Sequence, residues 1–198
     1  MLSQVVAYSG VLASVWLVLG VFVAGLRYEG YSHAKQFCSE LGAAGSPTEK
    51  FSPLINNYPL GVLFSLFGVY VMTSDSSSTI MIVVGVLIVM HGLGTWVAGY
   101  FPMDADPYTE TPTFSCKVHS WAGFVMLFSL LIAPALSLFD DGLPLPFKAF
   151  TVACLLCTVL FMATLAKAFK EKGNPGIHQR LSYGAQLAWL SGLSITLA

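Results

Sequence analysis

Long apolar stretches separated by shorter polar segments dominate the 198-residue chain. Each stretch has about 20 residues, the length of an α-helix that crosses the ~30 Å hydrocarbon core of a bilayer. Strands of a membrane barrel would instead alternate over about ten residues. We predict six spans, at residues 5–27, 56–74, 79–101, 117–138, 147–168 and 179–198. The pattern therefore predicts an all-α polytopic membrane protein in which residues 1–198 form a single six-helix transmembrane domain.

Composition agrees with this fold class. Hydrophobic residues make up 56% of the chain and charged residues 10%, whereas soluble domains carry about a quarter charged residues. The net charge of −1 and the lack of a basic stripe exclude nucleic acid as a partner. The first apolar stretch has no basic residues before it and is too long for a cleavable signal peptide, so we interpret it as the first span.

The charged residues are distributed unequally between the two ends of the predicted bundle. The connections 28–55, 102–116 and 169–178, with the adjoining helix ends, hold eight of the nine Lys and Arg residues and seven of the ten acids. The positive-inside rule then places these connections in the cytoplasm and both termini outside, in the cell (inner) membrane. Basic residues that bind an anionic lipid head group would also raise the number of Lys and Arg residues on this face, whichever side of the membrane it occupies.

The first of these connections contains a segment with helical periodicity. Residues 31–42 predict a short interfacial helix that ends at Gly42, with His33 and Glu40 on one side of it. This helix would be either a lid over a site or an ordinary interfacial helix. Cys38 and Cys116 lie on the same face, where they would pair in an oxidising compartment and stay as thiols in the cytoplasm.

The histidines supply the candidate chemistry at this face. Asp104 follows the third span and His119 begins the fourth, and a carboxylate beside an imidazole orients the ring and raises its basicity. The alternative is a capping and salt-bridge network between the same residues. His119, His178, Asp104 and His33 form the candidate ligand set for a divalent metal such as zinc, although their spacing is not that of a standard zinc motif.

Polar residues also lie inside the predicted spans. His91 lies about ten residues inside the third span, where it is either a ligand or proton-relay group or a neutral histidine bonded to a neighbouring helix. His178, Ser182 and Gln186 follow one another at four-residue intervals along the last span. Arg180 would either bind a phosphate through two hydrogen bonds or anchor the helix at the interface.

Three short segments carry a resemblance to a known family. They are Ser39-Glu40-Leu41-Gly42-Ala43, then Phe101-Pro102-Met103-Asp104, and His119 at the start of the fourth span. On the basis of these segments the chain resembles the prokaryotic membrane family called domain of unknown function 998. The resemblance covers nearly the whole chain. The resemblance implies six spans and the cell membrane, and it implies no activity. It singles out Ser39, Gly42, Pro102, Asp104 and His119.

Two classes of function fit these residues. The first is an interfacial lipid hydrolase or transferase, in which a metal-bound water or an acid–base group attacks an ester, amide or phosphodiester. Its catalytic residues would be His119, Asp104, His178 and Glu40, and its substrate-binding residues Arg180, Ser39, His91 and Gln186. The second is a non-enzymatic transporter, lipid-binding protein or accessory subunit. Membrane lipids are the expected partners in both, and a homo-oligomer or another membrane protein stays open as a partner.

Overall fold

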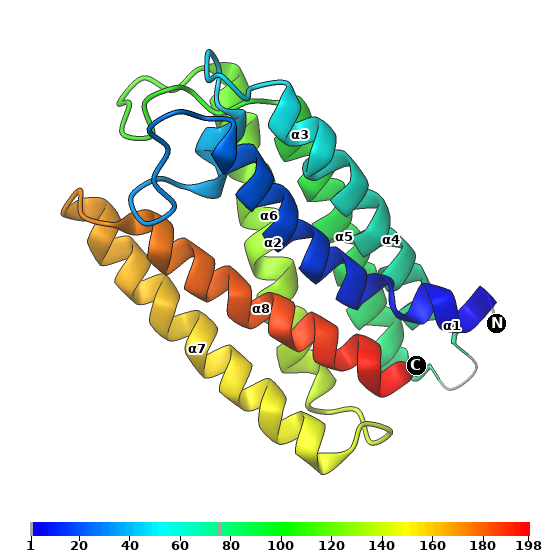
Figure 1. The fold of residues 1–198 in the computed structure, drawn as a ribbon. Coiled ribbons are helices and arrows are strands. Elements are labelled where there is room, and N and C mark those ends of the chain that lie inside the picture. Colours follow the sequence, from blue (N-terminus) through cyan, green and yellow to red (C-terminus); the bar gives the residue numbers. More distant parts are fainter. Residues whose placement is uncertain (1, 75–76) are drawn as a thin grey trace.

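A computed structural model describes residues 2–74 and 77–198, and its regular elements in this part of the chain are all helical (Figure 1). The elements are α1 (Leu2–Ala7), α2 (Ser9–Leu26), the 3-10 helix η1 (Cys38–Gly42), α3 (Phe51–Ile55), α4 (Asn57–Thr73), α5 (Thr79–Tyr100), α6 (Phe114–Ser137), α7 (Leu145–Lys170) and α8 (Pro175–Leu197). The predicted spans lie within a few residues of the long helices.

Five helices are long enough and apolar enough to cross a membrane: α2, α3 continued by α4, α5, α6 and α7. The helix α8 has 23 residues but is not in this group of apolar helices. The structure therefore confirms an all-α bundle of membrane type and supports five of the six predicted spans by length and composition.

Two local predictions differ from the structure. The first span is interrupted at Tyr8, between α1 and α2. The predicted interfacial helix over residues 31–42 is wrong in its extent, because the regular structure there is limited to η1. The backbone of Phe37 is extended, and its N–H donates to Glu40 Oε1 at 2.7 Å, so the turn begins only after Phe37.

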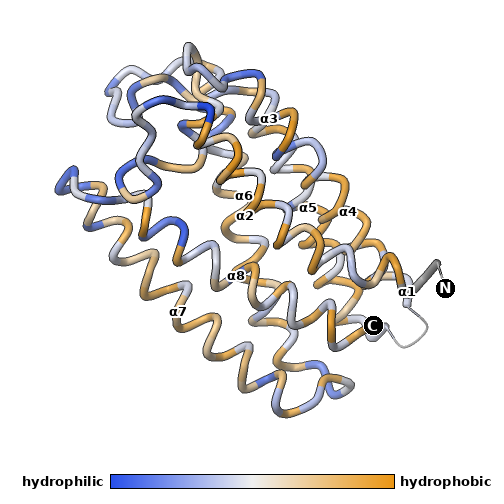
Figure 2. Tube along the Cα trace, in the orientation of Figure 1, coloured by the Kyte–Doolittle hydropathy of each residue, from blue (hydrophilic) through white to orange (hydrophobic). Residues whose placement is uncertain are grey.

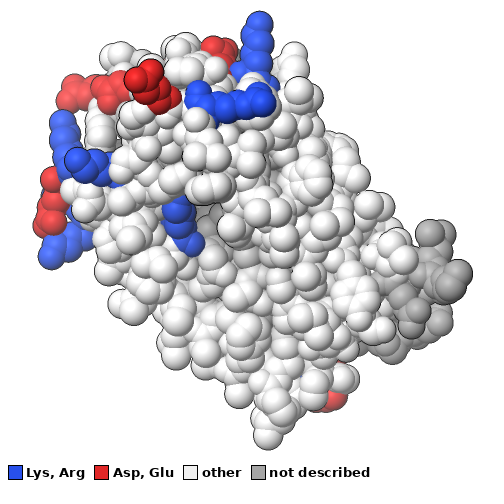
Figure 3. All heavy atoms as spheres, in the orientation of Figure 1, with Lys and Arg blue, Asp and Glu red and all other residues white. Residues whose placement is uncertain are grey.

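The long helices lie side by side and form one bundle. The helix α4 packs on α5, α5 on α6, and α7 on α8, while α2 contacts both α4 and α8. Both termini lie at one end of the bundle, and the three polar connections lie at the opposite end (Figure 1). Hydrophilic residues gather at this second end and near the start of α8 (Figure 2), and most Lys, Arg, Asp and Glu side chains visible in Figure 3 lie there too. We call it the polar end.

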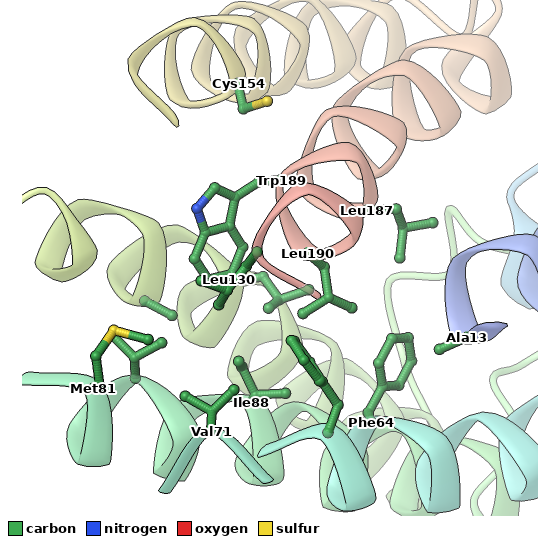
Figure 4. Packing of buried hydrophobic residues seen from close by; sticks show 14 of the residues in the cluster. Ala13, Phe64, Val71, Met81, Ile88, Leu130, Cys154, Leu187, Trp189 and Leu190 are labelled. Carbon is green, nitrogen blue, oxygen red and sulfur yellow. The ribbon is translucent and has the colours of Figure 1, made fainter. Parts of the chain in front are cut away.

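A hydrophobic core fills the half of the bundle nearer the termini. Phe64 and Phe67 of α4 and Trp189, Leu190 and Leu193 of α8 are fully or almost fully buried in it. Figure 4 shows side chains from α2, α4, α5, α6, α7 and α8 converging on this region. The core holds the helices together at this end, so the helices can be packed less tightly toward the polar end.

Glycines bring α4 and α5 into close contact. A Cβ atom added to Gly68 would lie 2.6 Å from the carbonyl oxygen of Gly85, and one added to Gly92 would lie 2.8 Å from that of Gly61. Small residues at such crossings allow two membrane helices to pack backbone against backbone. This contact fixes the position of α5, which carries His91.

Candidate ligand cavity

A cavity of about 720 Å³ lies inside the half of the bundle nearer the polar end. Residues of α2, α4, α5, α6, α7 and α8 line it, together with residues of the first connection and α3. Most of these side chains are apolar, and none of the residues that line the cavity is Asp, Glu, Lys or Arg. Its volume is within the range of about 300–1,000 Å³ that is usual for small-molecule sites.

The deep wall of the cavity holds a hydrogen-bonded pair, His91 and Tyr183. The ring of His91 is fully buried, and its Nδ1 lies 3.0 Å from the carbonyl oxygen of Met126. A carbonyl can only accept, so Nδ1 carries the proton. The hydroxyl of Tyr183 then donates to Nε2, over 2.8 Å. His91 therefore has both ring nitrogens bonded to neighbouring helices.

Other polar side chains on this wall also donate their protons to the protein. Thr95 Oγ1 donates to the carbonyl oxygen of His91 at 2.8 Å, and Ser182 Oγ donates to that of Thr158 at 3.3 Å. Gln186 is buried beside them, and its Nε2 has no hydrogen-bond partner in the described part of the chain. Apart from Gln186 Nε2, these polar groups have already donated their protons and can still accept hydrogen bonds.

His119 lines the same cavity nearer the polar end and binds the C-terminal end of α5. Its Nδ1 is 2.9 Å from the carbonyl oxygens of both Ala98 and Phe101, so the ring N–H is shared between two groups at the C-terminus of α5. Helix C-termini leave such carbonyls without intrahelical partners. In the neutral form of the ring, the second nitrogen, Nε2, is the one that keeps a lone pair.

The remaining segments of the family resemblance form one network at the polar end. Asp104 accepts hydrogen bonds from the backbone N–H and the hydroxyl of Thr113, at 2.9 and 2.6 Å. These bonds keep the pKa of Asp104 below its ordinary value. The N–H of Ala44 donates to the carbonyl oxygen of Met103 at 2.9 Å and joins the first connection to the third. Ser39 and Gly42 line the cavity, and Asp104 does not.

Arg180 lies outside the cavity and holds the first connection against α8. Its Nη1 donates to the carbonyl oxygens of Gln36 and Gly176, at 2.8 and 3.0 Å. Its Nη2 donates to the hydroxyl of Tyr31 at 2.6 Å and lies 3.3 Å from Nδ1 of His33. Both terminal nitrogens are therefore bonded within the protein, which does not favour the predicted phosphate-binding role.

Glu40 and His178, predicted as catalytic residues, do not line the cavity. Glu40 accepts from Phe37 N and, at 3.2 Å, from Gln36 Nε2, so both of its oxygens serve the first connection. Nδ1 of His178 is buried, and no hydrogen-bond partner for it is found among the described residues.

The predicted metal ligands do not come together. Within residues 2–74 and 77–198, no group of three or more His, Cys, Asp or Glu side chains could hold a metal ion. Asp104 and His119 are bonded to Thr113 and to the end of α5, and the cation Arg180 lies beside His33. Among the described residues the structure thus does not gather His119, His178, Asp104 and His33 around one point, and the zinc site stays a prediction. Cys38 and Cys116 are free thiols and form no disulfide.

The prediction found part of the cavity wall. His91, His119, Ser39 and Gln186 line the cavity, while His33, Glu40, Asp104, His178 and Arg180 do not. Sequence reasoning missed several polar residues of the wall, namely Ser52, Asn56, Asn57, Gln179 and Tyr183. The adjacent pair of asparagines at the start of the second predicted span was the available signal.

Fold and cavity define an α-helical membrane protein with an uncharged internal cavity near one end of its bundle. The sequence profile of a family described as proteins of unknown function, DUF998, matches residues 11–196. The match covers nearly the whole chain, so the protein belongs to this family and the predicted resemblance is confirmed. No curated protein and no solved structure matches the chain.

Proposed function

We propose that this protein is a membrane-embedded binding protein whose cavity holds a small lipid-like amphiphile. The observation that carries the proposal is the cavity of about 720 Å³, apolar over most of its lining and provided with uncharged polar groups in its deep wall. Small-molecule sites commonly combine an apolar lining with a few polar groups that orient the ligand. This is the non-enzymatic function that the sequence left open.

The positions of the ionisable residues support binding better than hydrolysis. A general base must lie within hydrogen-bond reach of the proton that it abstracts. Asp104 and Glu40 are bonded to their own loops and do not line the cavity. His91 has both ring nitrogens bonded to the protein. His119 does line the cavity, with its Nδ1 bonded to the end of α5, but no acid lines the cavity beside it. The lipid hydrolase stays a prediction.

The proposal includes the finer membrane topology. We propose that α8 is the sixth span and that the polar end faces the cytoplasm. Ser182 and Gln186 lower the hydropathy of α8, yet both are buried and line the cavity, so they need not contact lipid. The excess of Lys and Arg at the polar end supports the orientation.

A cavity-filling variant tests the binding function. Ala98 is buried and lines the cavity, so Ala98→Phe would place a ring in the space that the ligand needs. Ala153 of α7 is exposed and does not line the cavity, so Ala153→Phe is the matched control. Each protein would be purified in mild detergent, and the co-purified lipid per chain would be measured by mass spectrometry. We expect wild type and Ala153→Phe to retain a bound amphiphile and Ala98→Phe to lose it.

Two outcomes would contradict this function. Equal amounts of lipid in wild type and Ala98→Phe would show that the cavity is not the binding site. Turnover of a lipid ester by the wild type, lost in a folded His119→Ala variant, would favour the hydrolase instead.

A further inference from the structure

The cavity opens to one side of the bundle. Its exposed lining residues all belong to two helices: Ser120, Gly123 and Phe124 of α6, and Ala166 and Phe169 of α7. The lining residues of every other element are buried or half-buried. The helix α7 packs mainly on α8, and α6 packs mainly on α5, so α6 and α7 contact each other less than either contacts its main partner. The opening therefore lies between α6 and α7.

The polar end of the cavity is covered. Phe37, Cys38 and Ser39 of the first connection line it there. The ring of Phe169 lies 5.9 Å from the ring of Phe37 and stacks on Tyr108 of the third connection at 4.7 Å. Direct access from water is thus obstructed. The side opening lies deeper, since Gly123 is about 14 Å along the helix from the start of α6, at ~1.5 Å per residue.

The lining of the cavity does not suit a charged ligand. None of its side chains is an acid, Lys or Arg, and burial raises the pKa of the Cys38 thiol, which disfavours a thiolate there. Arg180 lies near this wall, and its charge would repel a cation. Its terminal nitrogens are already bonded within the protein, so they are not available to bind an anion. Moving an ion out of water into such a site costs several kcal/mol unless a counter-charge compensates it.

The hydrogen bonds of the lining indicate which neutral head group would fit. His91, His119, Thr95, Ser182 and Tyr183 each donate a proton to another group of the protein. Their remaining capacity is to accept, for example through the lone pairs of Tyr183 Oη and, in the neutral ring, of His119 Nε2. Gln186 Nε2, a buried donor of this wall without a partner among the described residues, needs an acceptor instead. A hydroxyl or an amide both donates and accepts and would satisfy both kinds of group, whereas a head group that only accepts would leave the lone pairs unpaired.

We propose that the ligand is an uncharged amphiphile with an apolar chain and a hydrogen-bond donor head, such as a hydroxyl or an amide, and that it reaches the cavity sideways from the membrane between α6 and α7. This inference rests on the proposed binding function and names the ligand class and its path. The cytoplasmic orientation of the polar end is not needed for it.

Probes that share one chain and differ in the head group test the ligand class. Binding of tritiated oleyl alcohol to the purified protein would be measured in detergent. Specific binding is the difference between the binding to wild type and the binding to Ala98→Phe. Competition would be measured with oleamide, oleyl methyl ether, oleate at pH 9 and oleyltrimethylammonium. We expect oleamide to compete at concentrations similar to unlabelled oleyl alcohol. The ether should be about tenfold weaker, the factor that corresponds to one lost hydrogen bond of ~1.4 kcal/mol, and both ions should be at least as weak.

A substitution at Gly123 tests the path. A Cβ at this position would have no atom of another part of the protein within 4 Å, so Gly123→Trp can begin a bulky side chain at the opening. Gly184 of α8 is equally exposed and free of contacts but does not line the cavity, so Gly184→Trp is the matched control. We expect uptake and release of oleyl alcohol to slow about tenfold or more in Gly123→Trp and to be unchanged in Gly184→Trp.

The outcomes separate this inference from the function on which it rests. Equal or stronger competition by an ion or by the ether would overturn the ligand class, and a wild-type uptake rate in Gly123→Trp would overturn the path. If lipid co-purifies in the manner expected but neither oleyl alcohol nor oleamide binds, the class is wrong and the binding function stands. If no lipid co-purifies and no probe binds, the binding function itself fails.

Discussion

The hydrogen bond between His91 and Tyr183 joins α5 to α8 at the deep wall of the cavity. The sequence indicated that His91 is either a ligand or relay group or a neutral histidine bonded to a neighbouring helix. Its contacts with Met126 and Tyr183 correspond to the second interpretation. The residue thus shapes the cavity by holding two helices at a fixed separation.

Removal of one hydroxyl tests this role. Tyr183→Phe leaves Nε2 of His91 buried without a donor, which costs about 1–3 kcal/mol for an unsatisfied buried group. We expect the free energy of unfolding, measured by titration with SDS in mixed micelles, to fall by that amount. Tyr100 is 72% exposed, so Tyr100→Phe is the control and should unfold like the wild type. Equal stability of both variants would show that the bond contributes nothing.

His33 provides a second prediction at this scale, in the pH dependence of stability. Burial and, next, the neighbouring charge of Arg180 lower its pKa in the folded protein. The unfolded chain therefore binds a proton at a pH where the folded protein does not. Stability should be constant above the ordinary histidine pKa of about 6.5 and should fall as the pH drops below it, down to the pKa of the folded state.

The variant His33→Gln isolates this contribution. It should flatten the fall in unfolding free energy below about pH 6.5, while His178→Gln should retain the part that belongs to His33. Unfolding curves measured across this pH range would check the difference. An identical slope in wild type and His33→Gln would contradict the assignment.

At the scale of elements, the sequence predicted the long helices well and the connections poorly. A span is determined by its own composition over about 20 residues, so its limits can be read locally. The extent of η1 depends on the extended backbone of Phe37 and the cap supplied by Glu40. Asp104 bonds Thr113, nine residues further on, in place of a catalytic partner. Such pairings depend on how the loops fold over one another, which periodicity does not encode.

The same distinction explains the cavity. His91 and Gln186 were identified because polar side chains inside apolar spans are unusual. Tyr183 and Asn57 were missed because the faces that they present depend on helix rotation within the bundle. The predicted metal ligands are not gathered among the described residues for a related reason, since nearness to one membrane face does not bring side chains within bonding distance of one another.

The contact between α4 and α5 gives a prediction at this scale. A Cβ at Gly68 would lie 2.6 Å from the carbonyl oxygen of Gly85 and 2.7 Å from Cγ2 of Val89. Gly68→Val must therefore separate the helices, and we expect a loss of about 1–3 kcal/mol in unfolding free energy. Gly184→Val, at an exposed position free of contacts, should change stability far less. The comparison fails if SDS titration shows equal losses in the two variants.

For the whole molecule, the bundle combines a tightly packed half with a half that contains a cavity. The core around Phe64 and Trp189 holds the helices at the end near the termini. Toward the polar end the loop network of Asp104, Thr113, Ala44 and Met103 holds them instead. A bundle fixed at both ends can keep a cavity between them and an opening between α6 and α7.

Membrane orientation is the prediction that belongs to this scale. All four cysteines would be replaced by serine or alanine. A single cysteine would then be introduced in place of Glu110 at the polar end or of Asp141 at the opposite end. If the polar end faces the cytoplasm, a membrane-impermeant maleimide added to intact cells should label Asp141→Cys and leave Glu110→Cys unlabelled until the cells are permeabilised. The reverse pattern would place the polar end outside. Labelling of both positions in intact cells would show that the chain between them does not cross the membrane an odd number of times, and the proposed topology would be wrong.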